Sequence, residues 1–253
     1  MLLALVLTLH AFNTLWWIML ENSFAHQASI WNFLFNGLYG MEYLCGGIIG
    51  MYYHRRLGGL KSTIGTSLFF LSMGMIIYSV GAFTWLGYNL LSKTELPYPS
   101  WADLFYSLLV PFFVIGLWRL LKMYNAFSSW KRILEFLVLL VIISCVMIFV
   151  VIHPDISPHL PFGVNFFNLF YPLGDSFLAT LAIIAFRSSG GKMDKSILIF
   201  SAGLIVHTSA DILFSYRNSH GLYWNGDVSD YVFACAGFML SLGIVGIIRS
   251  FDK

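Results

Sequence analysis

Residues 226–244 are GDVSDYVFACAGFMLSLGI, and the apolar stretch inside this segment continues to about residue 249. A helix of about 20 mostly apolar residues is long enough to cross the hydrocarbon core of a bilayer. The chain cannot cover such helices with a soluble shell, because only 10% of its 253 residues are charged and 58% are hydrophobic, whereas soluble domains carry roughly 25% charged residues. We therefore expect an all-α membrane protein whose main partner is the lipid bilayer.

Other apolar stretches of similar length precede this one, and the connections between them are too short to hold a soluble domain. The expected spans are roughly 1–20, 30–53, 63–90, 102–121, 132–152, 165–186, 195–216 and 229–249. Residues 1–253 should thus form a single polytopic domain of about eight transmembrane helices. The first span has no Lys or Arg before it, so we expect it to be kept as a helix and not removed as a signal peptide.

The basic residues define an orientation for these spans. Lys and Arg are retained on the cytoplasmic side of a membrane protein. Of the 14 Lys and Arg residues, only Lys93 and Arg217 fall on one side of the expected spans, and the others flank alternate connections or the C-terminus. We therefore expect both termini to be cytoplasmic, in a protein of the plasma membrane. The net charge of +2 gives no indication of a nucleic-acid partner.

Several helices resemble one another. PSWADLFYSLLVPFFVIG (99–116) is similar to 166–182 and 226–244, and more faintly to 31–40, while GMIIYSVGAF (74–83) is similar to GLIVHTSADI (203–212). We interpret this pattern as a helical hairpin repeated three or four times, in the segments 1–53, 63–121, 132–186 and 195–249. The alignment places Tyr78 against His207.

The same alignment places Asp103, Asn168 and Asp230 in equivalent positions near the outer, N-terminal ends of their helices. There an Asp or Asn can cap free backbone N–H groups and interact favourably with the helix dipole. Capping is the first interpretation of these three residues, and a ligand-binding role is the alternative.

Four titratable residues lie deep inside expected spans, where charge is costly and usually faces the interior of the bundle. These residues are Glu42, Asp175, His207 and Asp211. His207 and Asp211 are four residues apart, so they share one helix face. Such a pair can act as a proton- or ligand-responsive site, or as a polar clasp between helices.

The surroundings of the other two residues leave their roles open. Asp175 follows Pro172 and Gly174, which permit a kink and a close helix approach, so this carboxylate is a candidate ligand or cation site or a partner of a nearby hydroxyl. Glu42 lies among glycines, which favours close packing around a hydrogen-bonded glutamate. Farther out, Tyr98, Trp101, Tyr223 and Trp224 fall where an interfacial aromatic belt is expected.

The sequence carries no motif that identifies a catalytic centre, a metal site or a cofactor. His153, Asp155 and His159 match no metal-ligand spacing, and GxSxG, HExxH and P-loop patterns are missing. An intramembrane enzyme would need more convergent groups than one deep histidine and a few carboxylates, so enzyme function is the least favoured class.

PSWADLFY, YPLGD and ADILFSYRNSHGLYWNGDVSDYVFACAGF together resemble the N-terminal multi-spanning sensor regions of prokaryotic histidine kinases and diguanylate cyclases. The resemblance covers roughly residues 63–249 and implies a role in signal transduction, but no particular ligand residues. No kinase or cyclase output segment follows up to Lys253. We therefore expect a signal to pass to a separate cytoplasmic partner, or the chain to be the membrane portion of a larger assembly.

Two main functions follow from these observations. The first is a membrane sensor whose helices enclose an outward-facing polar pocket lined by Asp175, Asp211 and His207, with Glu42 a less certain member. The second is a transporter of a small solute or ion that uses the buried carboxylates.

Overall fold

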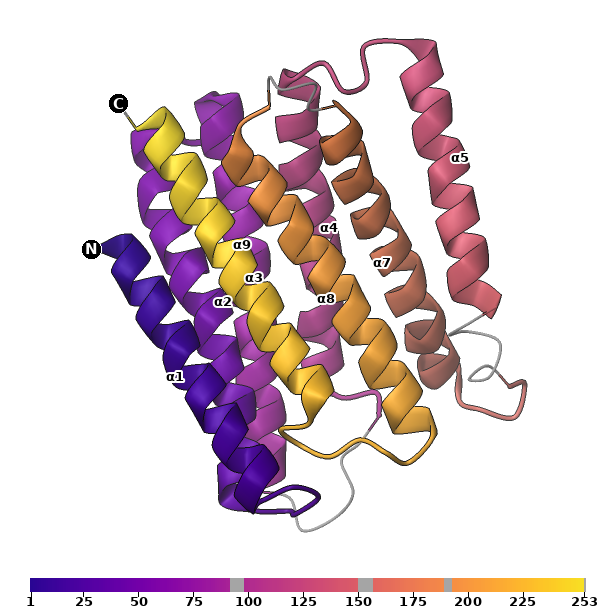
Figure 1. Ribbon diagram of the computed structural model, residues 1–253. Coiled ribbons are helices and arrows are strands. Elements are labelled where there is room, and N and C mark those ends of the chain that lie inside the picture. The colour runs from indigo at the N-terminus through magenta and orange to yellow at the C-terminus, as the bar shows by residue number, and fades with distance from the viewer. Residues whose placement is uncertain (92–97, 150–156, 189–192, 253) are drawn as a thin grey trace.

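The computed structural model describes residues 1–91, 98–149, 157–188 and 193–252, and its regular elements in these ranges are helical (Figure 1). The elements are α1 (Leu2–Ser23), α2 (Ile30–Arg56), the 3₁₀ helix η1 (Gly59–Lys61), α3 (Thr63–Leu91), α4 (Trp101–Met123), α5 (Trp130–Met147), α7 (Phe162–Ser188), α8 (Lys195–Ser219) and α9 (Val228–Phe251). Each expected apolar stretch corresponds to one of the α-helices, with ends that differ by a few residues.

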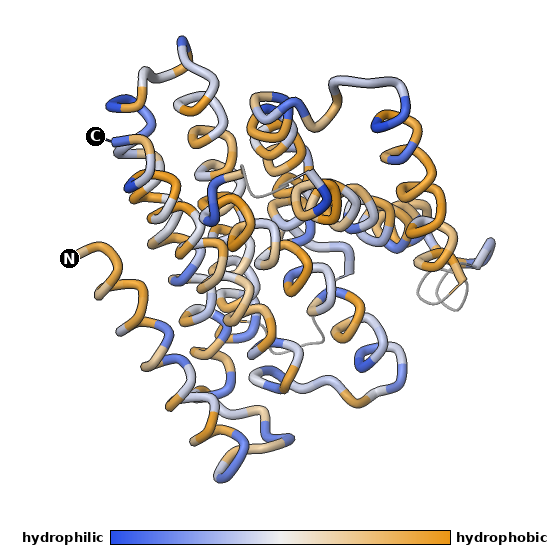
Figure 2. The backbone as a smooth tube through the Cα atoms, turned by 45° about the horizontal axis from the view of Figure 1, so that its top comes forward, coloured by the Kyte–Doolittle hydropathy of each residue, from blue (hydrophilic) through white to orange (hydrophobic). Residues whose placement is uncertain are grey.

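Six of these helices are long and apolar enough to cross a membrane: α1, α3, α4, α7, α8 and α9. Hydrophobic residues follow the helices, and hydrophilic ones concentrate at helix ends and turns (Figure 2). The chain is therefore a multi-pass helical membrane protein. Of the other two α-helices, α2 contains the polar residues Asn32, Asn36 and Glu42, and α5 is the shortest and carries Lys131, Arg132 and Glu135 within its 18 residues.

The two ends of the bundle differ in charge. One end, here called the basic end, carries Arg55, Arg56, Lys61, Arg119, Lys122, Lys131, Arg132, Arg187, Lys195 and Arg249. The opposite end, here called the pocket end, carries Arg217 at the end of α8. Lys93, Lys192 and Lys253 lie outside the described residues. Successive helices of the ring run in opposite directions between these two ends, and α1 begins partway along the bundle (Figure 1).

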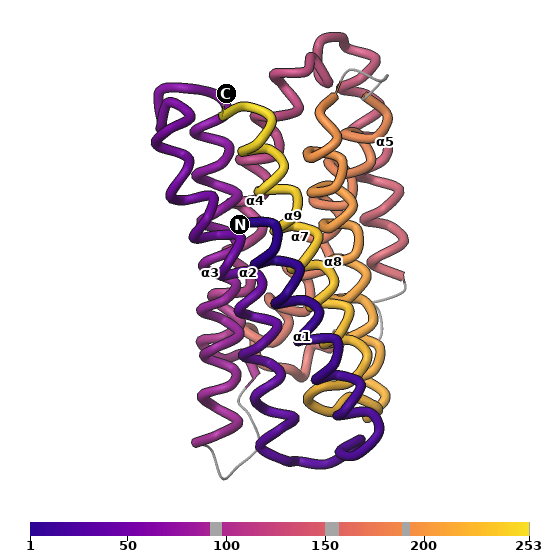
Figure 3. Tube along the Cα trace, turned by 60° about the vertical axis from the view of Figure 1, so that its left-hand side comes forward, coloured from indigo at the N-terminus to yellow at the C-terminus, as the bar shows by residue number. Residues whose placement is uncertain are grey.

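Six helices form a closed ring in the order α2, α3, α4, α7, α8 and α9, with α9 packing back against α2. Helix α1 lies outside the ring against α2 and α9, and α5 lies on the other side against α7 (Figures 1 and 3). Arg187 of α7 forms an ion pair with Glu135 of α5 at the basic end. The ring encloses the space in which the predicted polar residues can meet.

The α3–α4 and α8–α9 hairpins make equivalent contacts. The matching pairs are Leu71–Gly116 with Phe200–Gly243, Phe113–Gly74 with Leu240–Gly203, and the ring pairs Tyr78–Tyr106 with His207–Phe233. A Cβ atom added to Gly116 would lie 2.6 Å from Leu71, and one added to Gly243 would lie 2.6 Å from Phe200. Glycine therefore sets how closely the two helices of each hairpin approach.

Polar residues at the third position of three helices help to fix where these helices begin. Asn32, Asp103 and Asp230 are the third residues of α2, α4 and α9. Asp103 accepts a hydrogen bond from the Ser100 N–H at 2.6 Å in a capping box, and Asp230 accepts one from the Gly226 N–H at 2.6 Å. Asn168 differs from the expectation, because α7 begins at Phe162 and places Asn168 seventh, beyond the capping turn.

Candidate functional site

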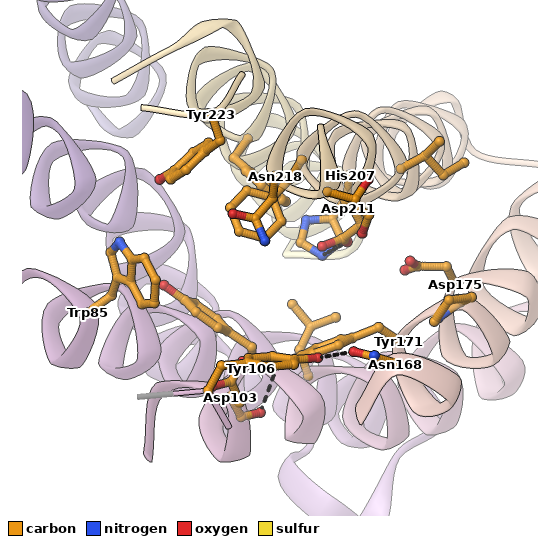
Figure 4. A pocket seen from close by; sticks show the side chains of 18 of the residues that line it. Trp85, Asp103, Tyr106, Asn168, Tyr171, Asp175, His207, Asp211, Asn218 and Tyr223 are labelled. Atoms are coloured by element: carbon orange, nitrogen blue, oxygen red, sulfur yellow. Dashed lines mark hydrogen bonds and ion pairs between the residues drawn. The ribbon is translucent and has the colours of Figure 1, made fainter. Parts of the chain in front are cut away.

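A cavity of about 720 Å³ lies inside the ring toward the pocket end (Figure 4). Its walls come mainly from α3, α4, α7, α8 and α9 and from the loop between α8 and α9. Its polar and aromatic lining includes Tyr39, Tyr78, Trp85, Tyr98, Asp103, Tyr106, Asn168, Tyr171, Asp175, His207, Asp211, Asn218, Tyr223, Asn225 and Asp230. Exposed residues such as Tyr98, Asn218 and Ser219 border its mouth.

The cavity brings together three of the four titratable residues singled out from the sequence. Asp175 reaches it from the middle of α7, and His207 and Asp211 reach it from α8. Asp175 lies thirteen residues after Phe162, about 20 Å along the helix at 1.5 Å per residue. Its carboxyl group points across the space toward Asp211 (Figure 4). The pocket therefore extends from the end of the bundle to about half its depth.

His207 is held between a tyrosine and an aspartate. Its Nδ1 lies 2.9 Å from the Tyr43 hydroxyl of α2, and its Nε2 lies 3.3 Å from Oδ2 of Asp211. The Tyr43 hydroxyl also donates to the carbonyl of Phe233 in α9 at 3.2 Å. These contacts join α2, α8 and α9 and hold the imidazole in one orientation, with Nε2 turned toward the carboxylate.

Aromatic rings surround His207 on its inner side. The Tyr78 ring lies 5.2 Å away and the Phe233 ring 5.5 Å away, both in edge-to-face arrangements. Tyr78 also packs on Tyr106, with ring centres 4.9 Å apart. His207 is only 3% exposed. Its imidazole therefore faces the polar part of the cavity through the edge that lies next to Asp211.

Toward the mouth, the acidic residues already have donors. Asp103 accepts from the Tyr171 hydroxyl at 3.1 Å, and Asp230 accepts from the Tyr223 hydroxyl at 3.3 Å. Burial, followed by the charge of Asp230, raises the pKa of Tyr223 well above its usual value, so this loop phenol stays a donor. Asn168 accepts from the Tyr98 hydroxyl at 2.6 Å. These bonds shape the mouth of the cavity.

Glu42 lies in a separate cluster between α1 and α2. Its Oε1 atom accepts a hydrogen bond from the Asn13 side chain at 2.5 Å and lies 3.1 Å from Nδ1 of His10. His10 stacks on Phe238 of α9 at 4.1 Å. Glu42 is thus buried where α1 docks on the outside of the ring, and it does not line the cavity. The less certain fourth member of the predicted pocket therefore belongs to the attachment of α1.

Sequence reasoning did not single out the aromatic wall and the amide that fixes it. Trp85 donates to Asn225 at 3.0 Å, and Asn225 in turn donates to Asn89 at 3.2 Å. These bonds tie the α8–α9 loop to the end of α3. Tyr98 and Tyr223 were assigned to an interfacial belt, yet both line the cavity. The sequence feature that could have indicated this role is the position of the two tyrosines beside turns, in PYPSWADLFY and GLYWNGD.

The half of the ring toward the basic end is closed by packed side chains. The rings of Phe113 in α4 and Phe200 in α8 meet edge to face at 5.5 Å. Leu71, Leu117 and Leu204 are fully buried around them. Together with the close helix approach at the glycines, these residues form a packed layer on the basic side of the cavity, here called the floor.

The described residues contain no group of three His, Cys, Asp or Glu side chains placed to hold a metal ion. His153 and Asp155 lie outside the described residues, and His159 lies in the short stretch before α7. Comparisons with protein-family models, with curated proteins and with solved structures find no significant match.

Proposed function

We propose that the protein is a membrane sensor module that binds a small ligand in this cavity and passes the signal to a cytoplasmic partner. The observation that carries the proposal is a polar pocket that opens at one end of the ring and stops at a packed floor near its middle. Buried polar groups that converge in a cavity are a common form of ligand site. A closed floor suits a receptor that keeps its ligand on one side of the membrane.

The charge of the two ends supports an outward-facing pocket. Basic residues are retained in the cytoplasm, and they gather at the end opposite the cavity. On this basis both termini are cytoplasmic, and the ligand enters from outside the plasma membrane. A cytoplasmic partner protein would then bind the helix ends at the basic end and respond to changes in their positions.

The hairpins suggest how such a signal would travel. The equivalent contacts of the α3–α4 and α8–α9 hairpins support the proposed repeat, in which Tyr78 and Ala82 replace His207 and Asp211. Helix α8 carries His207 and Asp211 in the pocket and Phe200 in the floor. A ligand that moves α8 would change the contact between Phe200 and Gly243, and tightly packed helices move as units.

One observation favours a transporter as the second candidate. Asp175 lies at mid-depth in a helix that contains Pro172, and carriers use carboxylates and interrupted helices at this depth. A transporter must open its site to both sides in turn, whereas a sensor of the proposed kind exposes it to one side only. Accessibility from the two sides therefore separates the candidates.

The test uses Ser215→Cys, a position in the cavity wall on α8, in a background in which Cys45, Cys145 and Cys235 are alanine. A membrane-impermeant maleimide is applied to the outside or the inside of sealed vesicles. Leu222→Cys in the α8–α9 loop and Ser128→Cys between α4 and α5, both exposed, are the controls for the outer and inner sides.

A sensor predicts labelling of Ser215→Cys from the Leu222 side alone. Labelling from both sides would establish a transporter, and labelling from neither side would exclude an open pocket. Hydrogen exchange at the basic ends of α8 and α9 is then measured before and after a bulky maleimide fills the pocket. A sensor predicts that exchange there changes, while exchange in α5 stays constant; an unchanged pattern in α8 and α9 would remove the signalling role.

A further inference from the structure

We propose that the ligand of this pocket is a small organic cation, held through a primary or quaternary ammonium group between Asp175, Asp211 and the aromatic wall. The inference rests on the proposed function, since it names the chemical class that the same pocket recognises. It is carried by three features of the cavity: a buried carboxyl group that faces a second carboxyl group, a described lining without Lys or Arg, and a ring of aromatic faces.

Asp175 is the first of these features. Its side chain is only 5% exposed, and it points into the cavity. No hydrogen bond from an N–H group of the described residues reaches it, and the polar group that it interacts with directly is the carboxyl group of Asp211. A buried carboxyl group without a donor is costly. A bound primary ammonium group would supply both an N–H donor and a positive charge, and a quaternary ammonium group would supply the charge.

The balance of charge is the second feature. Asp175 and Asp211 face one another in the membrane interior, and no Lys or Arg is among the described residues that line the cavity. The nearby Arg217 is already engaged, because its Nε donates to Asp227 at 2.5 Å and its guanidinium also donates to the Leu222 carbonyl at 3.1 Å. His207 lies beside Asp211 alone, so two facing carboxylates share a single basic neighbour among the described residues and attract a cation from outside the protein.

Aromatic faces are the third feature, and they favour an organic cation over a metal ion. Tyr78, Tyr106, Tyr171, Tyr223 and Trp85 line the same space. Tyrosine and tryptophan rings attract ammonium groups through their electron-rich faces, and cages of such rings are a recurring site for quaternary ammonium ligands. A metal ion would instead need several converging oxygen or nitrogen ligands, and the described residues provide no group of three.

The size of the cavity points the same way. Its volume of about 720 Å³ lies within the range of roughly 300–1,000 Å³ that is usual for small-molecule sites. The ammonium group would occupy the deep end near Asp175, where Val110 packs against Gly174, and the rest of the molecule would extend toward the mouth. A free amine and the headgroup of a choline or ethanolamine lipid share this chemistry.

Thermal stability and direct binding test the inference on the full chain in a maltoside detergent that contains no ammonium group. The probes are choline, benzyltrimethylammonium and 3,3-dimethylbutanol, the last being a neutral molecule with the shape of choline. We expect both cations to bind and to raise the melting temperature, and the neutral molecule to bind at least about tenfold more weakly, as for loss of a charged contact. Equal binding of the neutral molecule, or no binding of either cation, would overturn the inference.

Two matched variants assign the effect to the pocket. Asp175→Asn should weaken binding of choline by about tenfold or more, while Glu42→Gln, which alters a buried carboxyl group outside the cavity, should leave the dissociation constant unchanged. If Asp175→Asn does not fold, Asp211→Asn replaces it with the same expectation. Unchanged binding by the folded pocket variant, or an equal loss in both variants, would overturn the site.

The source of the ammonium group is resolved in nanodiscs. If choline binds equally well in nanodiscs of phosphatidylcholine and of phosphatidylglycerol, the ligand is a free amine. If choline binds in phosphatidylglycerol discs but is excluded by the lipid in phosphatidylcholine discs, the ligand is a lipid headgroup. Failure of every cation probe, combined with one-sided labelling of Ser215→Cys and the exchange response of α8 and α9, would remove the ligand class and leave the sensor function standing.

Discussion

The hydroxyl of Tyr43 lies 2.9 Å from Nδ1 of His207, although 164 residues separate them along the chain. The contact crosses the ring from α2 to α8 and buries both groups, since Tyr43 is 0% and His207 3% exposed. A residue in the ring wall thereby fixes the position of the histidine that faces Asp211. The bond links the stability of the ring to the geometry of the pocket.

Tyr43→Phe should lower the free energy of unfolding by about 1–3 kcal/mol, because it leaves a buried ring nitrogen without its partner. Denaturation of the detergent-solubilised protein measures the change. Tyr52→Phe is the matched control, as Tyr52 is 59% exposed and its hydroxyl accepts a hydrogen bond from the exposed Arg56, and it should change the free energy by less than about 0.5 kcal/mol. Equal effects of the two changes would mean that the Tyr43–His207 bond contributes no stability.

The close approach of α8 and α9 gives a second prediction. Gly243→Ala should destabilise the protein by about 1–3 kcal/mol through overpacking, because the new Cβ atom would lie 2.8 Å from Cα and 2.9 Å from the backbone nitrogen of Phe200. Gly87→Ala in α3 should be neutral or stabilising by up to about 1 kcal/mol, since nothing lies within 4 Å of its added Cβ. Melting temperatures compare the two, and similar losses would show that the hairpin tolerates the extra atom.

The positions of the α-helices could be predicted because apolar stretches of this length form helices, and six of these helices are long and apolar enough to span a membrane. The pairing of His207 with Asp211 also followed from their spacing on one helix. Asp175 was expected in the same pocket from its depth alone, but that it faces Asp211 depends on α7 packing beside α8, and sequence periodicity does not specify neighbours. Glu42 had the same signature of a deep carboxylate, yet α1 covers it from outside the ring. Depth is encoded locally, whereas membership of a pocket depends on tertiary packing.

The repeat shows the same division between local and tertiary information. The alignment of Tyr78 with His207 predicted equivalent positions, and their hairpins indeed make equivalent contacts. It did not predict that the side-chain rings of Tyr78 and His207 would lie 5.2 Å apart inside the ring of helices. The aromatic wall was missed for a related reason, since Tyr and Trp near helix ends also mark the membrane interface.

The conformation of the α8–α9 loop at the pocket end depends on Arg217. Its Nε donates to Asp227, which is 0% exposed and caps α9. Arg217→Gln should therefore destabilise the protein by about 3–5 kcal/mol, because it leaves a buried carboxylate without its counter-charge. The exposed Arg56→Gln serves as the control and should cost less than about 0.5 kcal/mol. If unfolding measurements give equally small losses for both, Asp227 is stabilised sufficiently by its backbone donors.

The packed floor gives the prediction that bears most directly on sensing. Phe200 fills the space between Phe113 and Gly243 and is 0% exposed, so Phe200→Ala should cost about 3–5 kcal/mol through the cavity it leaves. If this ring also separates the pocket from the basic end, the same change should make Ser215→Cys reachable by the impermeant maleimide from the inner side. Phe214→Ala is the control, because Phe214 lines the cavity wall on the same helix but lies above the floor. Inner-side labelling in the Phe200 variant alone would show that a single buried contact keeps the site one-sided. Labelling that stays confined to the outer side in the folded Phe200 variant would place the barrier at another layer of the ring.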